Sequence, residues 1–362
     1  MNGSPARTHG PVRIVGTGLI GTSIGLGLTT LGVEVQLWDA SPSARLLAED
    51  LGAGRIPAED CAEPELIVVC VPPDVTASVV AEELQRFPNA VVTDVASVKA
   101  PIEQELGAVD GAASRYVGSH PMAGSESGGP LAGRADLFLG RPWVIAPDET
   151  ARDATLAIEA LVLDLGAEPV RLSAADHDRA VALISHAPQV VASLLAARLL
   201  DDRIGAAALA GQGLRDTTRI AASDPVLWTQ ILGANAASVA QVLRLLERDV
   251  AQFADALEAI DADGSRRVIA SHLRYGNEGV QRIPSKHGQH QEFVELSVLL
   301  DDSPGQLARL FADIGDSGIN IEDVRMDHAA GAKLGTVQVS VLPDSGVALR
   351  EALLERGWRV TE

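Results

Sequence analysis

The chain has 362 residues, and 29 Lys+Arg against 49 Asp+Glu give it a formal charge of −20. This length suggests two or three domains, and the acidic balance argues against a nucleic-acid backbone or an anionic membrane surface as a partner. No apolar run approaches the ~20 residues of a membrane span, and residues 1–11 lack the apolar core of a signal peptide. The two cysteines, Cys61 and Cys70, are too few for a disulfide framework, so we expect reduced thiols and a cytoplasmic protein.

Residues 11–170 alternate short β-branched runs with helical patterns, which is typical of an α/β domain. Near-continuous apolar strands separated by helices predict a doubly wound, Rossmann-type parallel sheet with both faces covered. We expect strands at 12–15, 33–38, 66–71, 91–95 and 143–146, and helices that include 19–31 and 76–86.

The pattern becomes all-helical over residues 171–285. Asp224 and Pro225 form a helix start signal, with Asp as the N-cap and Pro in the first turn, and the helical pattern continues to about residue 260. A single helix of that length would span roughly 50 Å. We therefore expect it to bury its apolar stripe against a partner, and this domain to form a homodimer.

Residues 276–291 are rich in Gly, Gln, Ser and His and indicate a linker. Residues 292–362 then predict a small third domain with the βαββαβ order of a ferredoxin-like α+β fold. We expect its strands at 293–300, 320–327, 336–341 and 358–361, and its helices at 304–317 and 347–356.

A glycine-rich loop follows the first expected strand and opens the first expected helix. Gly16 permits the tight turn, Gly18 lets a pyrophosphate approach the backbone, and Gly21 lets helix and strand pack closely. Together with Leu19 and Ile20, these residues would present backbone N–H groups of a helix N-terminus to the phosphates. A packing turn in a non-binding α/β domain is the competing interpretation.

Asp39 closes the second expected strand, close to the ~20 residues beyond the glycines at which dinucleotide-binding folds carry an acid. A carboxylate there accepts hydrogen bonds from the ribose hydroxyls and repels a 2′-phosphate, which favours NAD over NADP. Arg45 lies nearby in the sequence and would soften that discrimination.

Two further polar positions carry candidate chemistry. Ser97 follows the run 91–95, at the carboxyl end of a strand, where open α/β sheets bind ligands; a helix N-cap is the other interpretation. His120 lies in a predicted loop dense in Gly and Ser, residues 118–129. Its unperturbed pKa near neutrality suits a general base, although a loop His is often only a surface residue.

The helical domain offers His177 with Asp178, and further on His186. Arg215 and Arg219 are four residues apart and would share a helix face as a carboxylate clamp. A surface salt bridge is the competing interpretation for Arg215. The chain has no HExxH motif and no Cys/His cluster, so we expect no metal site.

The order of these motifs resembles the prephenate dehydrogenase family. The shared features are the glycine loop, residues 94–99, 118–124, 185–186 and 216–219, and they extend over about residues 11–285. Residues 292–362 resemble a separate module, the ACT domain, through residues 302–307 and 318–321. The resemblance implies a dinucleotide-binding domain at 11–170, a helical substrate and dimerisation domain at 171–285, and an ACT-like regulatory domain at 292–362. It implies NAD-dependent oxidative decarboxylation of prephenate to 4-hydroxyphenylpyruvate in tyrosine biosynthesis.

The resemblance also implies roles for individual residues. His120 would accept the proton of the substrate hydroxyl while a hydride passes to the nicotinamide, and Ser97 would orient both by hydrogen bonds. Arg219 would bind a substrate carboxylate, supported by Asp216. The pocket would also be lined by Ser125, Glu126, His186 and Gln189. Many family members carry a second His where this chain has Gln189, which leaves the substrate preference open.

Two alternatives remain open. Arogenate dehydrogenase performs the same reaction on the amino-acid analogue, whose ammonium Glu126 or Gln189 would accept. A non-catalytic NAD-binding sensor is the other, and the complete set of candidate catalytic residues argues against it. A β-hydroxyacid dehydrogenase of similar build would need a Lys in the helical domain, and no Lys lies between Lys99 and Lys286.

The ACT-like segment suggests an effector site. Asp302, Pro304 and Gly305 precede an expected helix whose free N–H groups suit a carboxylate. Asp302 would take an ammonium group, and Asn320 would be a second polar contact. We expect an aromatic amino acid, tyrosine or phenylalanine, as the effector; a plain capped turn is the other interpretation.

Overall fold

The computed structural model describes residues 5–58, 60–124, 128–147, 150–283, 293–301, 303–328 and 334–361. The chain divides into two compact units. The first contains residues 1–201 and 217–246, and the second contains residues 202–216 and 247–362.

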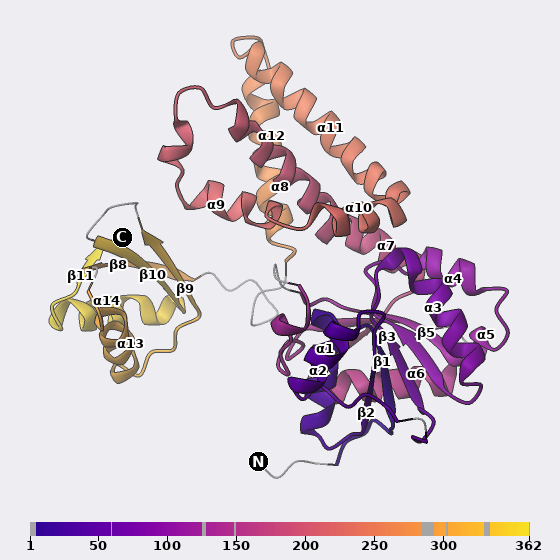
Figure 1. Ribbon diagram of the computed structural model, residues 1–362. Helices are drawn as coiled ribbons and strands as arrows, with labels where there is room; N and C mark the ends of the chain where they lie inside the picture. Colours follow the sequence, from indigo (N-terminus) through magenta and orange to yellow (C-terminus); the bar gives the residue numbers. More distant parts are fainter. Residues whose placement is uncertain are drawn as a thin grey trace. The chain divides into compact units, whose positions relative to one another are not determined.

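A seven-stranded sheet forms the centre of the first unit, in the order β2-β1-β3-β4-β5-β6-β7 (Figure 1). Its strands are β1 Val12–Val15, β2 Val35–Trp38, β3 Leu66–Val69, β4 Val91–Asp94, β5 Tyr116–Pro121, β6 Pro142–Ala146 and β7 Glu168–Arg171. Neighbouring strands are parallel except β5 and β6, which pair antiparallel. The expected doubly wound α/β sheet is confirmed, but the expectation of an all-parallel sheet is wrong at this pair.

The central strands are buried on both faces of the sheet, and successive side chains of a strand point to opposite faces. Val12 and Ile14 of β1 belong to one core cluster, and Val15 belongs to the other. The helices of this region are α1 Leu19–Thr30, α2 Pro42–Asp50, α3 Pro73–Arg86, α4 Ala100–Leu106, α5 Ala112–Arg115 and α6 Arg152–Asp164, with a 3₁₀ turn η1 at Pro130–Ala132. The sheet thus forms a rigid support for residues at the carboxyl ends of its strands.

His120 lies on a strand, which corrects the expectation of a loop over residues 118–129. Gly118, Ser119 and His120 belong to β5 and pair with Ala146, Ile145 and Val144 of β6. A Cβ at Gly118 would lie 3.0 Å from the Tyr116 hydroxyl and 3.1 Å from Lys99 Cδ. The segment therefore has small residues because a larger side chain at Gly118 would clash with Tyr116 and Lys99.

The helical region begins with one long run, from α7 Ala174–Val181 through a π-helical turn η2 Ala182–His186 to α8 Ala187–Arg198 and the 3₁₀ turn η3 Leu199–Asp201. Residues 174–201, with a window of mean hydropathy 1.6, are long and apolar enough to cross a membrane, and one third of that window is buried. This corrects the expectation that no apolar run approaches that length. Length and composition alone do not separate such a span from a helix that packs against protein.

The remaining helical elements are η4 Ala206–Leu209, α9 Gln212–Thr218, η5 Arg219–Ala221, α10 Pro225–Ala234, α11 Ala236–Glu258 and α12 Ser265–Val280. Asp224 caps α10 as expected and accepts a hydrogen bond from the Val226 N–H at 2.9 Å. The expected single helix from 225 to 260 is wrong, because α10 and α11 meet at Asn235 with a bend of 95°. At the bend, the Asn235 side chain donates to the Asp178 backbone carbonyl at 2.7 Å.

The C-terminal part of the second unit is a four-stranded antiparallel sheet in the order β11-β8-β10-β9. Its elements run in the chain order β8 Val294–Asp301, α13 Gln306–Asp316, β9 Asp323–His328, β10 Leu334–Val341, α14 Pro343–Glu355 and β11 Arg359–Thr361. This is the expected βαββαβ order. Leu310 and Ile314 of α13 and Leu349 and Leu353 of α14 pack with the strands in a core of their own.

Candidate active site

The glycine loop between β1 and α1 has the shape that a dinucleotide requires. Gly16 has φ +100°, and a Cβ there would lie 2.5 Å from the Cys70 carbonyl oxygen. A Cβ at Gly21 would lie 1.9 Å from the Gly16 carbonyl oxygen, whereas no atom lies within 4 Å of the Cβ position at Gly18. Gly16 and Gly21 are therefore required for packing. Gly18 leaves open space at the N-terminus of α1, where Leu19 and Ile20 begin the helix.

Asp39 connects the end of β2 to this loop. Its Oδ2 accepts hydrogen bonds from the Thr17 backbone N–H at 2.6 Å and the Thr17 hydroxyl at 3.0 Å, and its Oδ1 accepts from the Ser41 N–H at 2.7 Å. The carboxylate is thus held beside the glycine loop, as a ribose-binding acid would be. Arg45 lies in the next helix, and its buried Nε has no hydrogen-bond partner within the described residues.

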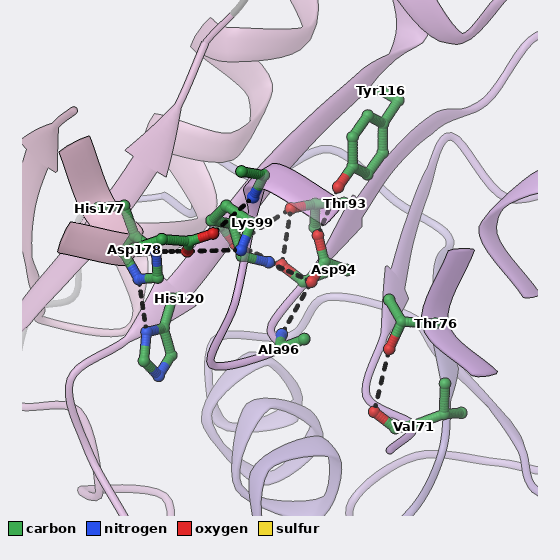
Figure 2. A network of polar contacts seen from close by, with 12 residues as sticks. Val71, Thr76, Thr93, Asp94, Ala96, Lys99, Tyr116, His120, His177 and Asp178 are labelled. Atoms are coloured by element: carbon green, nitrogen blue, oxygen red, sulfur yellow. Dashed lines mark hydrogen bonds and ion pairs between the residues drawn. The ribbon is translucent and has the colours of Figure 1, made fainter. Parts of the chain in front are cut away.

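A chain of hydrogen bonds leads from His120 into the helical region (Figure 2). His120 Nδ1 lies 2.9 Å from His177 Nε2, and His177 Nδ1 lies 2.8 Å from Asp178 Oδ1. The two rings meet edge to face, with centroids 5.1 Å apart. Sequence reasoning named His177 and Asp178 but gave them no role, because the contact joins positions 57 residues apart.

Burial lowers the pKa of His120 well below its usual 6.5, and the charges of His177, Lys99 and His186 act in the same direction. His120 is therefore neutral at physiological pH. A neutral imidazole retains one nitrogen lone pair, which is what a general base needs.

A buried ion pair lies behind this chain. Lys99 Nζ donates to Asp94 Oδ1, and both side chains are at most 1% exposed. Asp94 also accepts from the Ala96 N–H at 2.8 Å and from the Tyr116 hydroxyl at 2.7 Å (Figure 2). Burial, with the Asp94 charge, raises the pKa of Tyr116 well above 10, so this phenol stays a donor. The sequence did not reveal this pairing, although Lys99 lay inside a recognised motif.

Ser97 lies between β4 and α4, but it is not the N-cap of α4, because Lys99 occupies that position. Within the described part of the chain, Ser97 makes no hydrogen bond, and the His120 ring is held by His177 instead. The expectation that Ser97 orients His120 is therefore not met here. Its contact with a substrate hydroxyl stays a prediction.

His186 ends the π-helical turn and is 1% exposed. Its Nδ1 lies 3.2 Å from Asn235 Nδ2, and its ring meets that of Trp228 edge to face at 6.1 Å. Because the Asn235 amide nitrogen can only donate, His186 Nδ1 accepts and its Nε2 carries the proton. Burial lowers the pKa of His186 to about 4.

Other candidate positions lie on three elements of the helical region. Gln189, on α8, is buried, and its Nε2 donates to the Ser193 hydroxyl at 3.5 Å. Asp216 is exposed on α9 and accepts from the Gln212 amide at 2.7 Å. Arg215 lies on α9, and Arg219 opens η5 directly after α9 ends at Thr218, so their shared role as a carboxylate clamp stays a prediction.

Ser125 and Glu126 lie outside the described residues, as does Asp302. In the ACT-like segment, Gly305 has φ +89° and is the N-cap of α13, directly after Pro304. Asn320 precedes β9 rather than starting it and donates to Glu322 at 2.9 Å. A small pocket nearby is lined in part by Asp301, Ser303 and Gln306.

No group of three or more His, Cys, Asp or Glu side chains able to hold a metal ion occurs in the part of the chain that the structure describes. Cys61 and Cys70 are both free thiols. Burial raises the pKa of Cys70 far above its usual value, with the Asp94 charge acting in the same direction, so this thiol stays protonated.

Comparison with known proteins gives a consistent result. Residues 24–170 match the family model of the prephenate dehydrogenase nucleotide-binding domain, and residues 173–271 match that of the prephenate dehydrogenase dimerization domain. "Probable prephenate dehydrogenase NovF" of Streptomyces niveus is 39% identical over 356 residues, which cover 95% of this chain and 98% of the relative. The cyclohexadienyl dehydrogenase of Zymomonas mobilis is 32% identical over 267 residues, which cover 70% and 90%. Among solved structures, a prephenate dehydrogenase from A. aeolicus in complex with hydroxyphenyl propionate and NAD⁺ has a TM-score of 0.67 at 24% identity, and the match covers 78% of this chain and 100% of that one.

Proposed function

The chain belongs to the prephenate dehydrogenase family, and we propose that His120 is the base of its reaction. The activity is NAD-dependent oxidative decarboxylation of prephenate to 4-hydroxyphenylpyruvate, a step of tyrosine biosynthesis. The observation that carries the assignment of His120 is its hydrogen-bond chain to His177 and Asp178 at the end of β5.

The glycine loop and Asp39 fit NAD⁺, because the loop is open at Gly18 and the carboxylate is held beside it. When bound there, NAD⁺ supplies a hydride acceptor. His120, kept neutral by its lowered pKa, takes the proton of the substrate hydroxyl. Oxidation of the ring alcohol leads to loss of carbon dioxide, and the aromatic product supplies the driving force. The remaining task of the protein is to position the substrate.

Substrate positioning is assigned to side chains around this base. Arg219 would pair with a substrate carboxylate in a charge-assisted hydrogen bond, and His186 offers its Nε2–H as a donor. We also propose Ser97, Gln189, Asp216, Ser125 and Glu126 as substrate-binding residues.

The base assignment is tested by His120→Asn, with His272→Gln, a substitution on α12, as the matched control. We expect kcat to fall by about 10²–10⁴ while NAD⁺ affinity, measured by fluorescence titration, stays unchanged. A variant that keeps more than half of the wild-type kcat would remove His120 from the role of base.

Arogenate is the second candidate substrate, because Gln189 stands buried beside His186 on the next turn of the helix. The carbonyl oxygen of a neutral amide can accept a hydrogen bond from an ammonium group. Steady-state assays with prephenate and arogenate, each with NAD⁺ and NADP⁺, decide between the two through kcat/KM.

The oligomer that we propose is a homodimer formed through the helical domain. Leu183, Ile184 and Leu194 lie on the apolar run 174–201 and are about 60% exposed (62%, 63% and 62%) in the single chain. A partner helix would cover them, because exposed apolar faces of this kind mark interfaces. Light scattering on the purified chain should give twice 37.7 kDa. With both cysteines free, we propose the cytoplasm as the location.

The domain limits that we propose are 11–170, 171–285 and 292–362, the last being an ACT-like regulatory domain.

The effector of this ACT-like domain would be tyrosine or phenylalanine. The turn that contains Asp302, Pro304 and Gly305 would bind it, with Asn320 as a further contact. The turn opens a helix and adjoins the small pocket that includes Ser303 and Gln306. Calorimetric titration of the full chain with each amino acid, beside the activity assay, tests this; no heat and no rate change at millimolar ligand would contradict it.

A further inference from the structure

We propose that His177, anchored by Asp178, is a positioning residue that fixes the His120 tautomer so that Nε2 is the basic nitrogen. Its catalytic consequence rests on the proposed function, whereas the tautomer itself is a property of the free protein. Asp178 determines the direction of the hydrogen bonds in this chain, because its backbone partners can only donate.

Asp178 accepts only. Its Oδ1 receives the Lys99 backbone N–H at 2.8 Å, and its Oδ2 receives the Ala100 N–H at 2.9 Å. Both donors are backbone groups that cannot change role. The third contact, from His177 Nδ1 to Oδ1 at 2.8 Å, must therefore also be a donation, and the proton of His177 resides on Nδ1.

A neutral His177 then has a lone pair on Nε2, which faces His120 Nδ1 at 2.9 Å. His120 must donate there, so its own proton is on Nδ1 and its Nε2 is unprotonated. His177 is fully buried, and the groups around the pair already include the Lys99 cation, the Asp94 carboxylate, the Tyr116 phenol and neutral His186. A second cation beside Lys99 is unfavourable in this buried site, so one proton on the His177 ring, at Nδ1, accounts for both of its contacts.

This arrangement serves the reaction in two ways. It presents the His120 lone pair at Nε2, where a hydroxyl proton is taken as the O–H bond breaks and the hydride leaves for the nicotinamide. The imidazolium that forms keeps its Nδ1–H donation to His177, and the Asp178 carboxylate beyond it stabilises the new charge. The same logic of a base oriented by a second group operates in Ser-His-Asp sites.

The hydrogen-bond relay of Asp178, His177 and His120 is rigidly held. The Asp178 carboxylate accepts hydrogen bonds from two backbone N–H groups at the start of α4, and the Asp178 backbone carbonyl accepts from the Asn235 amide at 2.7 Å. His177 therefore cannot turn away from His120 without losing its Nδ1–H contact to a carboxylate that two backbone N–H groups hold in place. Rigid support of this kind is what separates a positioning residue from a chance neighbour.

The test uses two substitutions of similar size at His177. His177→Gln places an amide near the former Nε2 and keeps an acceptor for His120, whereas His177→Asn places it near the former Nδ1 and keeps only the contact with Asp178. His272→Gln is the control. Ring ¹⁵N shifts of labelled histidine at pH 8, with the His120 signals assigned by their loss in His120→Asn, report the tautomer directly.

We expect wild type and His177→Gln to have His120 protonated at Nδ1, and His177→Asn to lose this preference. The kcat of His177→Asn should fall by about 10–100-fold, which is a part of the contribution of a general base. His177→Gln should retain most of the wild-type kcat. A wild-type His120 protonated at Nε2 overturns the proposal even if the enzyme oxidises prephenate. Equal losses in both variants with an unchanged tautomer also overturn it. A wild-type Nδ1 tautomer that depends on His177 in a protein inactive on prephenate supports the relay and contradicts only the proposed function.

Discussion

Replacing Lys99 by Met should strongly destabilise the nucleotide-binding region. The substitution keeps the length of the side chain but removes the cation that faces Asp94, in a place where both groups are at most 1% exposed. Asp94 would keep the Ala96 N–H and Tyr116 hydroxyl as donors, but its charge would lack a counterion. Removing one partner of a buried pair costs about 3–5 kcal/mol, because the remaining charge stays desolvated.

For a cooperative region of 150–250 residues, about 2–4 °C is lost per kcal/mol, so the melting temperature should fall by about 6–20 °C. Circular dichroism at pH 8 measures this. Arg134→Met is the matched control, since the Arg134–Asp136 ion pair has an N–O contact of 2.9 Å but is 65% and 60% exposed. Exposed pairs contribute about 0–1 kcal/mol.

A double variant separates the stranded charge from the lost packing. If the carboxylate causes the loss, Lys99→Met combined with Asp94→Asn should be more stable than Lys99→Met alone. The reasoning is refuted if Lys99→Met melts within about 3 °C of the Arg134→Met control, a difference of about 1 kcal/mol, and the double variant recovers nothing.

Three further outcomes are expected. Arg219→Ala should raise the substrate KM, because a substrate carboxylate loses a charge-assisted partner that contributes about 2–5 kcal/mol if the pair is buried. Arg215→Ala should raise KM much less. Equal KM values for the two variants would mean that the wrong arginine is assigned. Asp39→Ser should narrow the ratio of kcat/KM for NAD⁺ over NADP⁺, since the carboxylate that repels a 2′-phosphate is gone while Arg45 remains; an unchanged ratio would remove Asp39 from the cofactor site. Because the folded-state pKa of His186, about 4, is below the usual 6.5, the unfolded chain binds more protons between these values, and the free energy of unfolding should fall as the pH drops through this window. Urea titrations at several pH values measure the free energy of unfolding of wild type, His186→Asn and His272→Gln. This free energy should change less with pH in His186→Asn than in the other two proteins.

Two of the strands that the sequence predicted correctly are buried along their whole length. Val12–Val15 and Leu66–Val69 are buried throughout, so their composition alone marks them. Strand β5 was missed because Gly118 and Ser119 have turn-like composition, although crowding against Tyr116 and Lys99 is the reason for it. Strand β7 was missed because it is an exposed edge strand with charged residues at both ends.

The candidate site was predictable only where its chemistry is local in the sequence. The glycine loop and Asp39 belong to one strand–helix–strand unit, so spacing identifies them. The hydrogen-bond chain that begins at His120 is not local in the sequence. His120 and His177 are 57 positions apart. The Lys99 N–H and Asp178 are 79 positions apart, and their contact depends on how α7 packs beside α4. A single sequence offers residue types for such a network but not the contacts that join them.

Asn235 lies at the bend between α10 and α11, where the helical pattern of the sequence gave a wrong prediction. Residues 225–258 follow helical periodicity on both sides of it, so no pattern predicts the bend. The buried Asn235 amide has two N–H groups, one directed to the Asp178 carbonyl and one to His186 Nδ1. Without this amide, that carbonyl and that nitrogen would lose their donor, and buried acceptors without donors are costly. Asn235, at the bend, therefore sets the tautomer of His186 and anchors Asp178, the residue that holds His177, so a side chain far along the sequence supports the proton chemistry of the site.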